Sequence, residues 1–229
     1  MNHEPSNPVD ADGIFRFHKS LVERFGAGTT RALGWRNIEG QWMRFEQLSQ
    51  IGDLSGHSVL DAGCGHADLF AFLKKRFSSV TYYGCEQIPD LLQVATQRYG
   101  REKNVTLLQG DFLDPAMPMT DFVLASGSLT YRHSNDDFVY KAIESLFANC
   151  RIALGFNLLS GSVEPNTLLR AYDPDDILRF CRTLSKTVQI QTGYWPDDFT
   201  VFLYKDLENP LHGNAGEHDD GLNDTVSGL

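Results

Sequence analysis

The chain has 229 residues, of which 41% are hydrophobic, and its formal net charge is −10. This length favours one domain with extensions over two domains, and no run of about 18 apolar residues is present that could span a membrane. Because phosphate binding needs clustered lysines and arginines, the acidic balance disfavours a nucleic-acid substrate. The four cysteines form no CxxC pair and no metal-site spacing, so we expect buried thiols, a reducing compartment and no bound metal.

Both ends of the chain are polar. Residues 1–11 lack the basic start and the apolar run of a secretory signal, so we expect a cytoplasmic protein with a disordered N-terminal tail. Residues 206–229 contain six acids, no lysine or arginine, and many glycines and asparagines. This composition predicts a second disordered tail, which is acidic.

Two helices are predicted before the first strand. Residues 12–25 place apolar side chains at helical spacing. A second helix is expected at about 38–51, where Trp42 and Phe45 would pack it onto the sheet. We expect residues 12–54 to form a helical lid over the domain and not a domain of their own.

From residue 55 to residue 205 the periodicity changes, and strands alternate with helices. This alternation predicts an α/β domain with a largely parallel sheet. No helix separates the last two strands, so they should pair antiparallel at one edge. The expected strands are 58–62, 80–86, 105–109, 121–126, 151–158, 186–192 and 199–204, and the expected helices are 69–77, 89–99, 137–150 and 174–184.

The most informative segment is VLDAGCGHAD, which ends the first strand and opens a helix. Gly63 and Gly65 allow a tight turn and the close approach of a ligand, and such turns bind ligands in doubly wound sheets. A nicotinamide enzyme would place a pyrophosphate here. Asp61 before the glycines and Asp68 after them suit an anion poorly and suit a cationic or zwitterionic ligand better. The amino group of a methionyl moiety is such a ligand, although Asp61 could instead only hold the loop.

Two further carboxylates follow the next two strands. Glu86 lies 21 residues after Gly65, where it could accept both hydroxyls of a ribose or be a plain solvated strand end. Asp111 could accept the exocyclic amine of adenine, with Phe112 or Ile88 flanking the ring, or it could only cap a helix. Three strand ends thus offer partners for an amino acid, a ribose and a base.

With these segments, VLDAGCGHADL, YYGCEQI, LLQGDFLD and DFVLASGSL, the chain resembles the class I S-adenosylmethionine-dependent methyltransferases over residues 55–205. The resemblance implies a doubly wound, Rossmann-like seven-stranded sheet of order 3-2-1-4-5-7-6 with strand 7 antiparallel, and S-adenosylmethionine as the cofactor. The family often has a small residue where His66 and Asp68 stand. The expected cofactor positions are Asp61, Gly63, Gly65, Glu86, Gln87, Ile88, Asp111, Phe112 and Ser126.

The acceptor side is less defined. Methyl transfer needs alignment and desolvation, and it needs a general base only when the acceptor must lose a proton. His133, after the fourth strand, is the candidate base, although a lone loop histidine is more often simply exposed. Trp35, Tyr131 and Asn157 are candidate pocket residues. Arg44 could pair with the methionyl carboxylate or extend along apolar surface into solvent.

The leading hypothesis is a small-molecule methyltransferase. The segment after the fourth strand lacks both prolines of the [DNS]-P-P-[YFW] motif, which lowers the odds of a nucleic-acid amino-group methyltransferase. An RNA or protein methyltransferase, a non-catalytic S-adenosylmethionine-binding protein and an NAD-dependent oxidoreductase remain as alternatives, because a fold alone does not fix a function.

Overall fold

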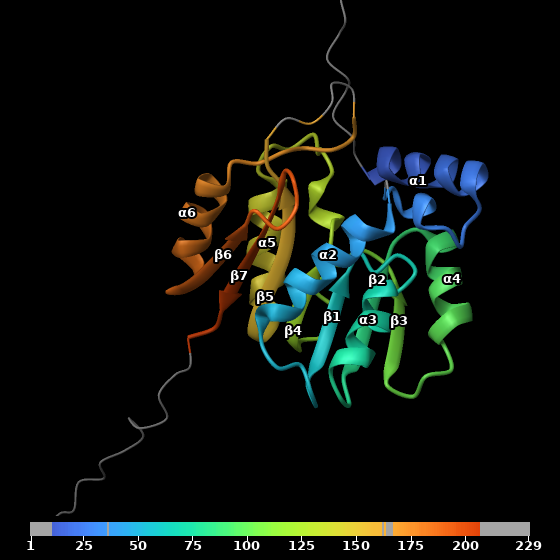
Figure 1. Ribbon diagram of the computed structural model, residues 1–229, viewed down its shortest axis with the longest axis horizontal. Helices are drawn as coiled ribbons and strands as arrows, with labels where there is room; N and C mark the ends of the chain where they lie inside the picture. The colour runs from blue at the N-terminus through green and yellow to red at the C-terminus, as the bar shows by residue number, and fades with distance from the viewer. Residues whose placement is uncertain (1–10, 36, 162, 164–166, 207–229) are drawn as a thin grey trace, which may run out of the picture.

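The computed structural model describes residues 11–35, 37–161, 163 and 167–206. The predicted tails, 1–11 and 206–229, lie almost entirely outside the described residues. Seven strands form one sheet in the order β3-β2-β1-β4-β5-β7-β6, which confirms the predicted fold (Figure 1). The strands are β1 Ser58–Ala62, β2 Thr81–Glu86, β3 Val105–Gln109, β4 Thr120–Ala125, β5 Cys150–Leu159, β6 Thr187–Thr192 and β7 Asp198–Tyr204.

The first five strands run parallel, and the last strand in the chain reverses the direction. β1 pairs with β2 and with β4 in parallel, whereas β7 lies antiparallel between β5 and β6. The carboxyl ends of the parallel strands therefore meet at one edge of the sheet, and the loops that follow them converge there.

Helices cover both faces of the sheet. α2 Ile38–Leu48 and α3 Asp68–Arg76 pack with one set of strand residues, and α4 Pro89–Tyr99 extends that layer over β2 and β3. α5 Phe138–Ala148 and α6 Pro174–Leu184 cover the other face. The alternation along β1 shows the reason, because Val59 joins the first layer and Leu60 the second. Both faces are buried, as in other parallel sheets.

The helix ends follow local sequence signals. Pro89 is the first residue of α4, and the side chain of Asp173 caps α6 by accepting from the amide of Asp175. The predicted helix 38–51 ends at Leu48 and continues as a 3-10 turn, η2 Ser49–Ile51. Trp42 packs against Phe72 of α3 instead of reaching the sheet, and it stays 38% exposed.

The N-terminal segment lies across the carboxyl edge of the sheet, where α1 runs above β2, β3 and α4 (Figure 1). It consists of α1 Ala11–Phe25 and a 3-10 turn, η1 Thr30–Leu33, whose N-cap is Thr29. A second 3-10 turn, η3 Ser128–Thr130, follows β4 at the same edge. No helix within the described ranges is long and apolar enough to cross a membrane.

Candidate functional site: the carboxyl edge of the sheet

The loop between β1 and α3 is shaped by two glycines in left-handed conformations. Gly63 has φ +83° and Gly65 has φ +55°. A Cβ atom at Gly63 would stand 2.6 Å from Cβ of Ser128, and one at Gly65 would stand 2.6 Å from Cδ2 of Leu33. The turn thus needs glycine both for its backbone and for the space around it. Leu33 also shows that the N-terminal segment closes directly over this loop.

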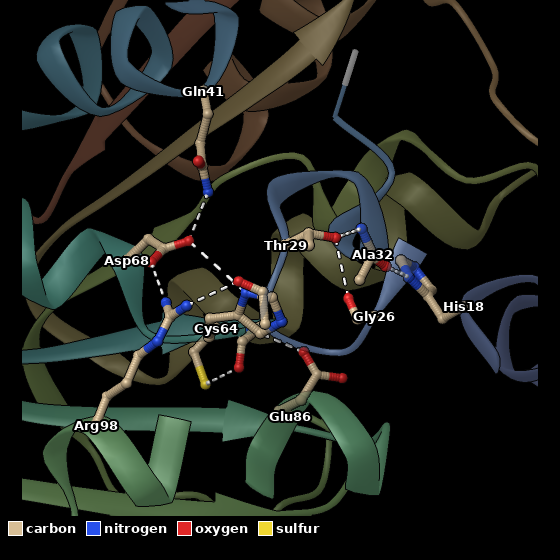
Figure 2. A network of polar contacts seen from close by, with 12 residues as sticks. His18, Gly26, Thr29, Ala32, Gln41, Cys64, Asp68, Glu86 and Arg98 are labelled. Atoms are coloured by element: carbon tan, nitrogen blue, oxygen red, sulfur yellow. Dashed lines mark hydrogen bonds and ion pairs between the residues drawn. The ribbon is translucent and has the colours of Figure 1, made fainter. Parts of the chain in front are cut away.

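Glu86, at the end of β2, braces the same loop. Its carboxylate accepts from the amide of Gly65 at 2.9 Å and from the amide of Ile88 at 2.8 Å. The side chain is buried, so it is not a solvated strand end. Burial raises the pKa of Glu86, and the amides that donate to it oppose that rise. Figure 2 shows Glu86 close to Cys64 of the loop.

Asp61 is a second buried carboxylate at this edge. It is 2% exposed, and the hydroxyl of Tyr82 donates to its Oδ2 at 2.5 Å. Burial raises the pKa of Asp61 to about 7, and the charges of Glu86 and Asp68 push it in the same direction. The amides of Gly63 and Cys64 donate to the carbonyl of Cys85, and the amide of Gly65 donates to Glu86, so these three loop amides are held by residues other than Asp61.

Asp111 follows β3 and is exposed. Its Oδ1 accepts from the amide of Leu113 at 2.9 Å, which fixes the carboxylate in a local turn. Phe112 is partly buried beside it, and Ile88 is buried on the loop after β2. Phe112 and Ile88 therefore border a space beside Asp111. The second carboxylate oxygen of Asp111 can accept a hydrogen bond from a ligand in that space.

A cavity of about 510 Å³ joins these side chains to the N-terminal segment. Its walls come from the loops after β1, β2, β3 and β4, from α1, η1 and α2, and from the turn before β7. All predicted cofactor positions and all but one predicted acceptor position line it. These residues are Asp61, Gly63, Gly65, Glu86, Gln87, Ile88, Asp111, Phe112, Ser126, Arg44, Trp35, Tyr131 and His133.

Asn157 is the exception, and the structure corrects its assignment to the acceptor pocket. It lies within β5, opposite Thr200 of β7, and is fully buried. Its amide nitrogen donates to the Thr200 hydroxyl at 2.6 Å, and that hydroxyl also bonds Tyr194 at 2.8 Å. The sequence placed Asn157 near the end of a strand, but pairing with β7 continues past it and covers the side chain.

Arg44 has a partner that the sequence did not indicate. Its Nε and Nη2 donate to the two carboxylate oxygens of Asp198 at 2.7 and 2.6 Å, and both side chains are buried. The guanidinium also lies over the Trp35 ring, 4.7 Å from the centroid. Its Nη1 would be 3.2 Å from a Cβ at Gly127, so it points toward the loop after β4. Arg44 is therefore a rigid part of the cavity wall and does not extend into solvent.

The polar network in Figure 2 ties the N-terminal segment to the glycine loop. Asp68 accepts from Gln41 of α2 at 3.2 Å and from Arg98 of α4 at 2.8 Å. Arg98 also donates to the carbonyl of Gly28 at 3.0 Å. His66, the other departure from the family pattern, is buried beside Asp68, and burial lowers its pKa to about 4. Asp68 thus links α3 to α2 and α4, and neither His66 nor Asp68 lines the cavity.

Two histidines line the cavity on its acceptor side. His133, the predicted base, stacks on Phe138 with ring centroids 3.5 Å apart. His18 of α1 was not predicted, although its Nε2 lies 2.8 Å from the Tyr131 hydroxyl and its Nδ1 lies 3.0 Å from the Ala32 carbonyl. Its place in the helical pattern of residues 12–25 concealed it, because only the fold brings it beside Tyr131.

Comparisons with known proteins address the family. Residues 59–151 match the family model described as a methyltransferase domain. The magnesium-protoporphyrin O-methyltransferase of Rhodobacter capsulatus is 35% identical over 97 residues, which are 41% of this chain and 42% of that protein. The match thus spans less than half of that relative.

Solved structures show the same fold. Magnesium protoporphyrin IX methyltransferase from Synechocystis PCC 6803, with bound S-adenosylhomocysteine, superposes with a TM-score of 0.61 at 16% identity, over 86% of this chain and 95% of that one. A S-adenosylmethionine-dependent methyltransferase from Aquifex aeolicus gives a TM-score of 0.56 at 15% identity, over 75% and 94% of the two chains. At these identities the likeness concerns the fold.

The family match covers β1 with its glycine loop, Glu86 and Asp111, all of which contribute to the lining of the cavity. The sheet order separates this fold from a plain nicotinamide-binding arrangement, since β7 is antiparallel between β5 and β6. The two Synechocystis structures hold S-adenosylhomocysteine and S-adenosylmethionine, respectively. Residues 59–151 therefore match a methyltransferase domain, and the described chain has the fold of solved S-adenosylmethionine-dependent methyltransferases.

Proposed function

We propose that this enzyme transfers the methyl group of S-adenosylmethionine to a small-molecule acceptor held between the N-terminal segment and the loop after β4. The observation that carries the proposal is the continuous cavity of about 510 Å³, which has cofactor positions on its floor and α1, η1 and α2 as its roof. A roofed cavity of this size fits a small ligand next to the cofactor. It does not favour a polymer, which needs an open groove.

The proposed cofactor pose follows the strand ends. Glu86 accepts the ribose hydroxyls through the lone pairs that Gly65 and Ile88 leave available. Asp111 accepts from the adenine amine, and Phe112 borders the ring. In this pose Gln87 and Ser126 line the cofactor without a specific charged contact.

The methionyl end is proposed to lie over the glycine loop. Asp61 faces the ammonium group, whose positive charge favours the ionised carboxylate. Arg44 keeps Nη1 for the methionyl carboxylate, because its other two nitrogens are engaged by Asp198. The acceptor is then bordered by Trp35 and by the aromatic side chains after β4.

Calorimetry tests the cofactor site. S-adenosylmethionine and S-adenosylhomocysteine should bind, and NAD should bind little. Asp111→Asn should weaken binding by about 1–3 kcal/mol, and Glu86→Gln by at least as much, because an amide would also face the loop amides that Glu86 accepts from. Glu144→Gln, on the exposed side of α5, is the matched control. Unchanged affinity in both site variants would refute this pose.

A metabolite panel tests the acceptor, with S-adenosylhomocysteine release as the readout. Magnesium protoporphyrin belongs in the panel because two of the similar proteins are named for it. RNA and protein substrates form the second arm, and product only in that arm would overturn a small-molecule acceptor. A cytoplasmic location stays a prediction, supported by four buried cysteines without disulfides.

A further inference from the structure

His18 and Tyr131 form a hydrogen-bonded pair on the acceptor side of the cavity. They lie 113 residues apart in sequence, and both line the cavity. The backbone of Tyr131 is fixed by a bridge to Leu169. His18 is fixed from the other side by the Ala32 carbonyl, as the dashed line in Figure 2 shows. The pair thus has a defined geometry without any ligand.

The hydrogen bonds determine where the protons are. A carbonyl oxygen can only accept, so Nδ1 of His18 carries the hydrogen that bonds Ala32. Burial lowers the pKa of His18, and its bond to Ala32 only partly offsets this, so the ring is neutral near pH 7. In the neutral ring Nε2 is an acceptor, and Tyr131 therefore donates its hydroxyl proton to His18.

This arrangement leaves the Tyr131 oxygen able to accept a proton from a ligand in the cavity. Burial raises the pKa of Tyr131, and the charge of Glu86 adds to that rise while Arg44 opposes it. The phenol therefore stays protonated and can pass on its own proton only as it receives another. The charge of a protonated His18 would also lower the pKa of His66.

We propose that Tyr131 and His18 form a proton relay for an acceptor hydroxyl, so that this enzyme methylates oxygen in phenols or alcohols. The proposal rests on the small-molecule function proposed above. The acceptor oxygen attacks the methyl carbon of the sulfonium, a C–O bond forms, and the C–S bond breaks to leave neutral S-adenosylhomocysteine. The acceptor proton moves to the Tyr131 oxygen, the Tyr131 proton moves to Nε2 of His18, and the imidazolium later releases one proton to water.

The relay distinguishes among acceptor classes. A carboxylic acid is ionised near pH 7 and needs no base, whereas a phenol with a pKa near that of tyrosine, about 10, must lose its proton during the reaction. A relay that ends on a neutral imidazole can take up this proton, so it suits phenols and not carboxylic acids. His133 also lines the cavity, and its ring is stacked on Phe138. Tyr131 is therefore the catalytic residue, and His18 acts through it.

Three probes of similar size test the relay: 4-methylphenol, 4-nitrophenol and benzoic acid, each with S-adenosylmethionine at mildly alkaline pH, where 4-nitrophenol is an anion. We expect the wild type to methylate both phenols. His18→Gln and Tyr131→Phe should each lower turnover of 4-methylphenol by about 100-fold or more. Turnover of 4-nitrophenol should fall by less than about fivefold, because this acceptor has no proton to lose.

Two matched variants control for handling and folding. His57→Gln changes a residue that precedes β1, and Tyr140→Phe changes a residue of α5 that lies against Phe180; neither residue lines the cavity. Both should keep wild-type turnover, and all four variants should keep their affinity for S-adenosylhomocysteine. Equal losses on the two phenols would show a structural role and overturn the relay.

Other results separate this inference from the function on which it rests. Methylation of benzoic acid alone, or of neither phenol while the cofactor binds, would overturn the relay and leave the methyltransferase assignment intact. Failure of the wild type to bind S-adenosylhomocysteine would instead overturn the proposed cofactor pose, and the relay with it.

Discussion

Asp61→Asn should make the ligand-free protein more stable at pH 8, although it removes a residue of the proposed cofactor site. Burial raises the pKa of Asp61 to about 7 from an ordinary value of 3.8. The folded protein therefore holds a proton on Asp61 that the unfolded chain gives up at lower pH. The contribution to stability is complete below pH 3.8 and is lost progressively as the pH rises to 7.

The size of the effect follows from the span of that loss. Between pH 5 and pH 7 the folded protein holds one proton more than the unfolded chain, so the free energy of unfolding of the wild type falls by about 1.36 kcal/mol per pH unit. Over these two pH units the loss is about 3 kcal/mol. Asparagine does not titrate, and its side-chain oxygen can still accept from the Tyr82 hydroxyl. The stability of Asp61→Asn relative to the wild type should therefore rise by about 3 kcal/mol from pH 5 to pH 8.

Urea unfolding of the ligand-free proteins at pH 5, 6, 7 and 8 measures this difference. Every other titrating group is shared by the two proteins, so its contribution largely cancels in the comparison. Asp137→Asn, at an exposed position before α5, is the matched control and should show no such trend. A stability difference that stays constant with pH, or a wild type that gains on the variant toward pH 8, would refute this account of Asp61.

The same titration should appear in cofactor binding. An ammonium group beside Asp61 requires the ionised carboxylate, so the affinity of the wild type for S-adenosylmethionine should fall about tenfold per pH unit below pH 7 and level off above it. Asp61→Asn should bind more weakly at pH 8 and lose this dependence. Calorimetry in buffers of different ionisation enthalpy would detect the released proton directly.

Two further predictions concern the frame of the site. Gly63→Ala should destabilise the protein by about 2 kcal/mol or more and abolish cofactor binding, because its Cβ would overlap Ser128. Gly56→Ala is the matched control, because Gly56 has a similar φ and open space around it. In thermal unfolding this control should cost only about 1 kcal/mol. Arg44→Met should cost about 3–5 kcal/mol in urea unfolding, because it leaves Asp198 buried and unpaired, and adding Asp198→Leu should recover most of that loss. A double variant no more stable than Arg44→Met would contradict this reading of the pair.

The fold was predictable because its signals are local or lie in family segments. Pro89 and Asp173 mark helix starts, and the change from helical to strand periodicity marks the domain. The expected cofactor positions were predictable for the same reason, since Asp61, Glu86 and Asp111 each lie at the end of a recognisable strand or directly after one. Parallel strands then bring these residues to one edge without further information.

The acceptor side was not predictable in this way, because its contacts join segments far apart in the chain. Arg44 meets Asp198 across 154 residues, and His18 meets Tyr131 across 113. No periodicity or spacing in one sequence records such pairs. Asn157 shows the opposite failure, since a residue near a strand end seemed open until β7 covered it.

The preference for a cationic ligand rests on fewer acids than the sequence suggested. Asp68 argued against a pyrophosphate when only its position was known, but its two oxygens are engaged by Gln41 and Arg98 in the roof. Asp61 and Glu86 remain, and both are buried carboxylates with raised pKa values. A pyrophosphate over the glycine loop would bring further negative charge to groups that already resist ionisation, whereas a sulfonium and an ammonium would relieve that resistance. The ligand charge is therefore selected mainly by two desolvated carboxylates, and Asp68 adds to this selection through its charge, which raises the pKa of Asp61 further.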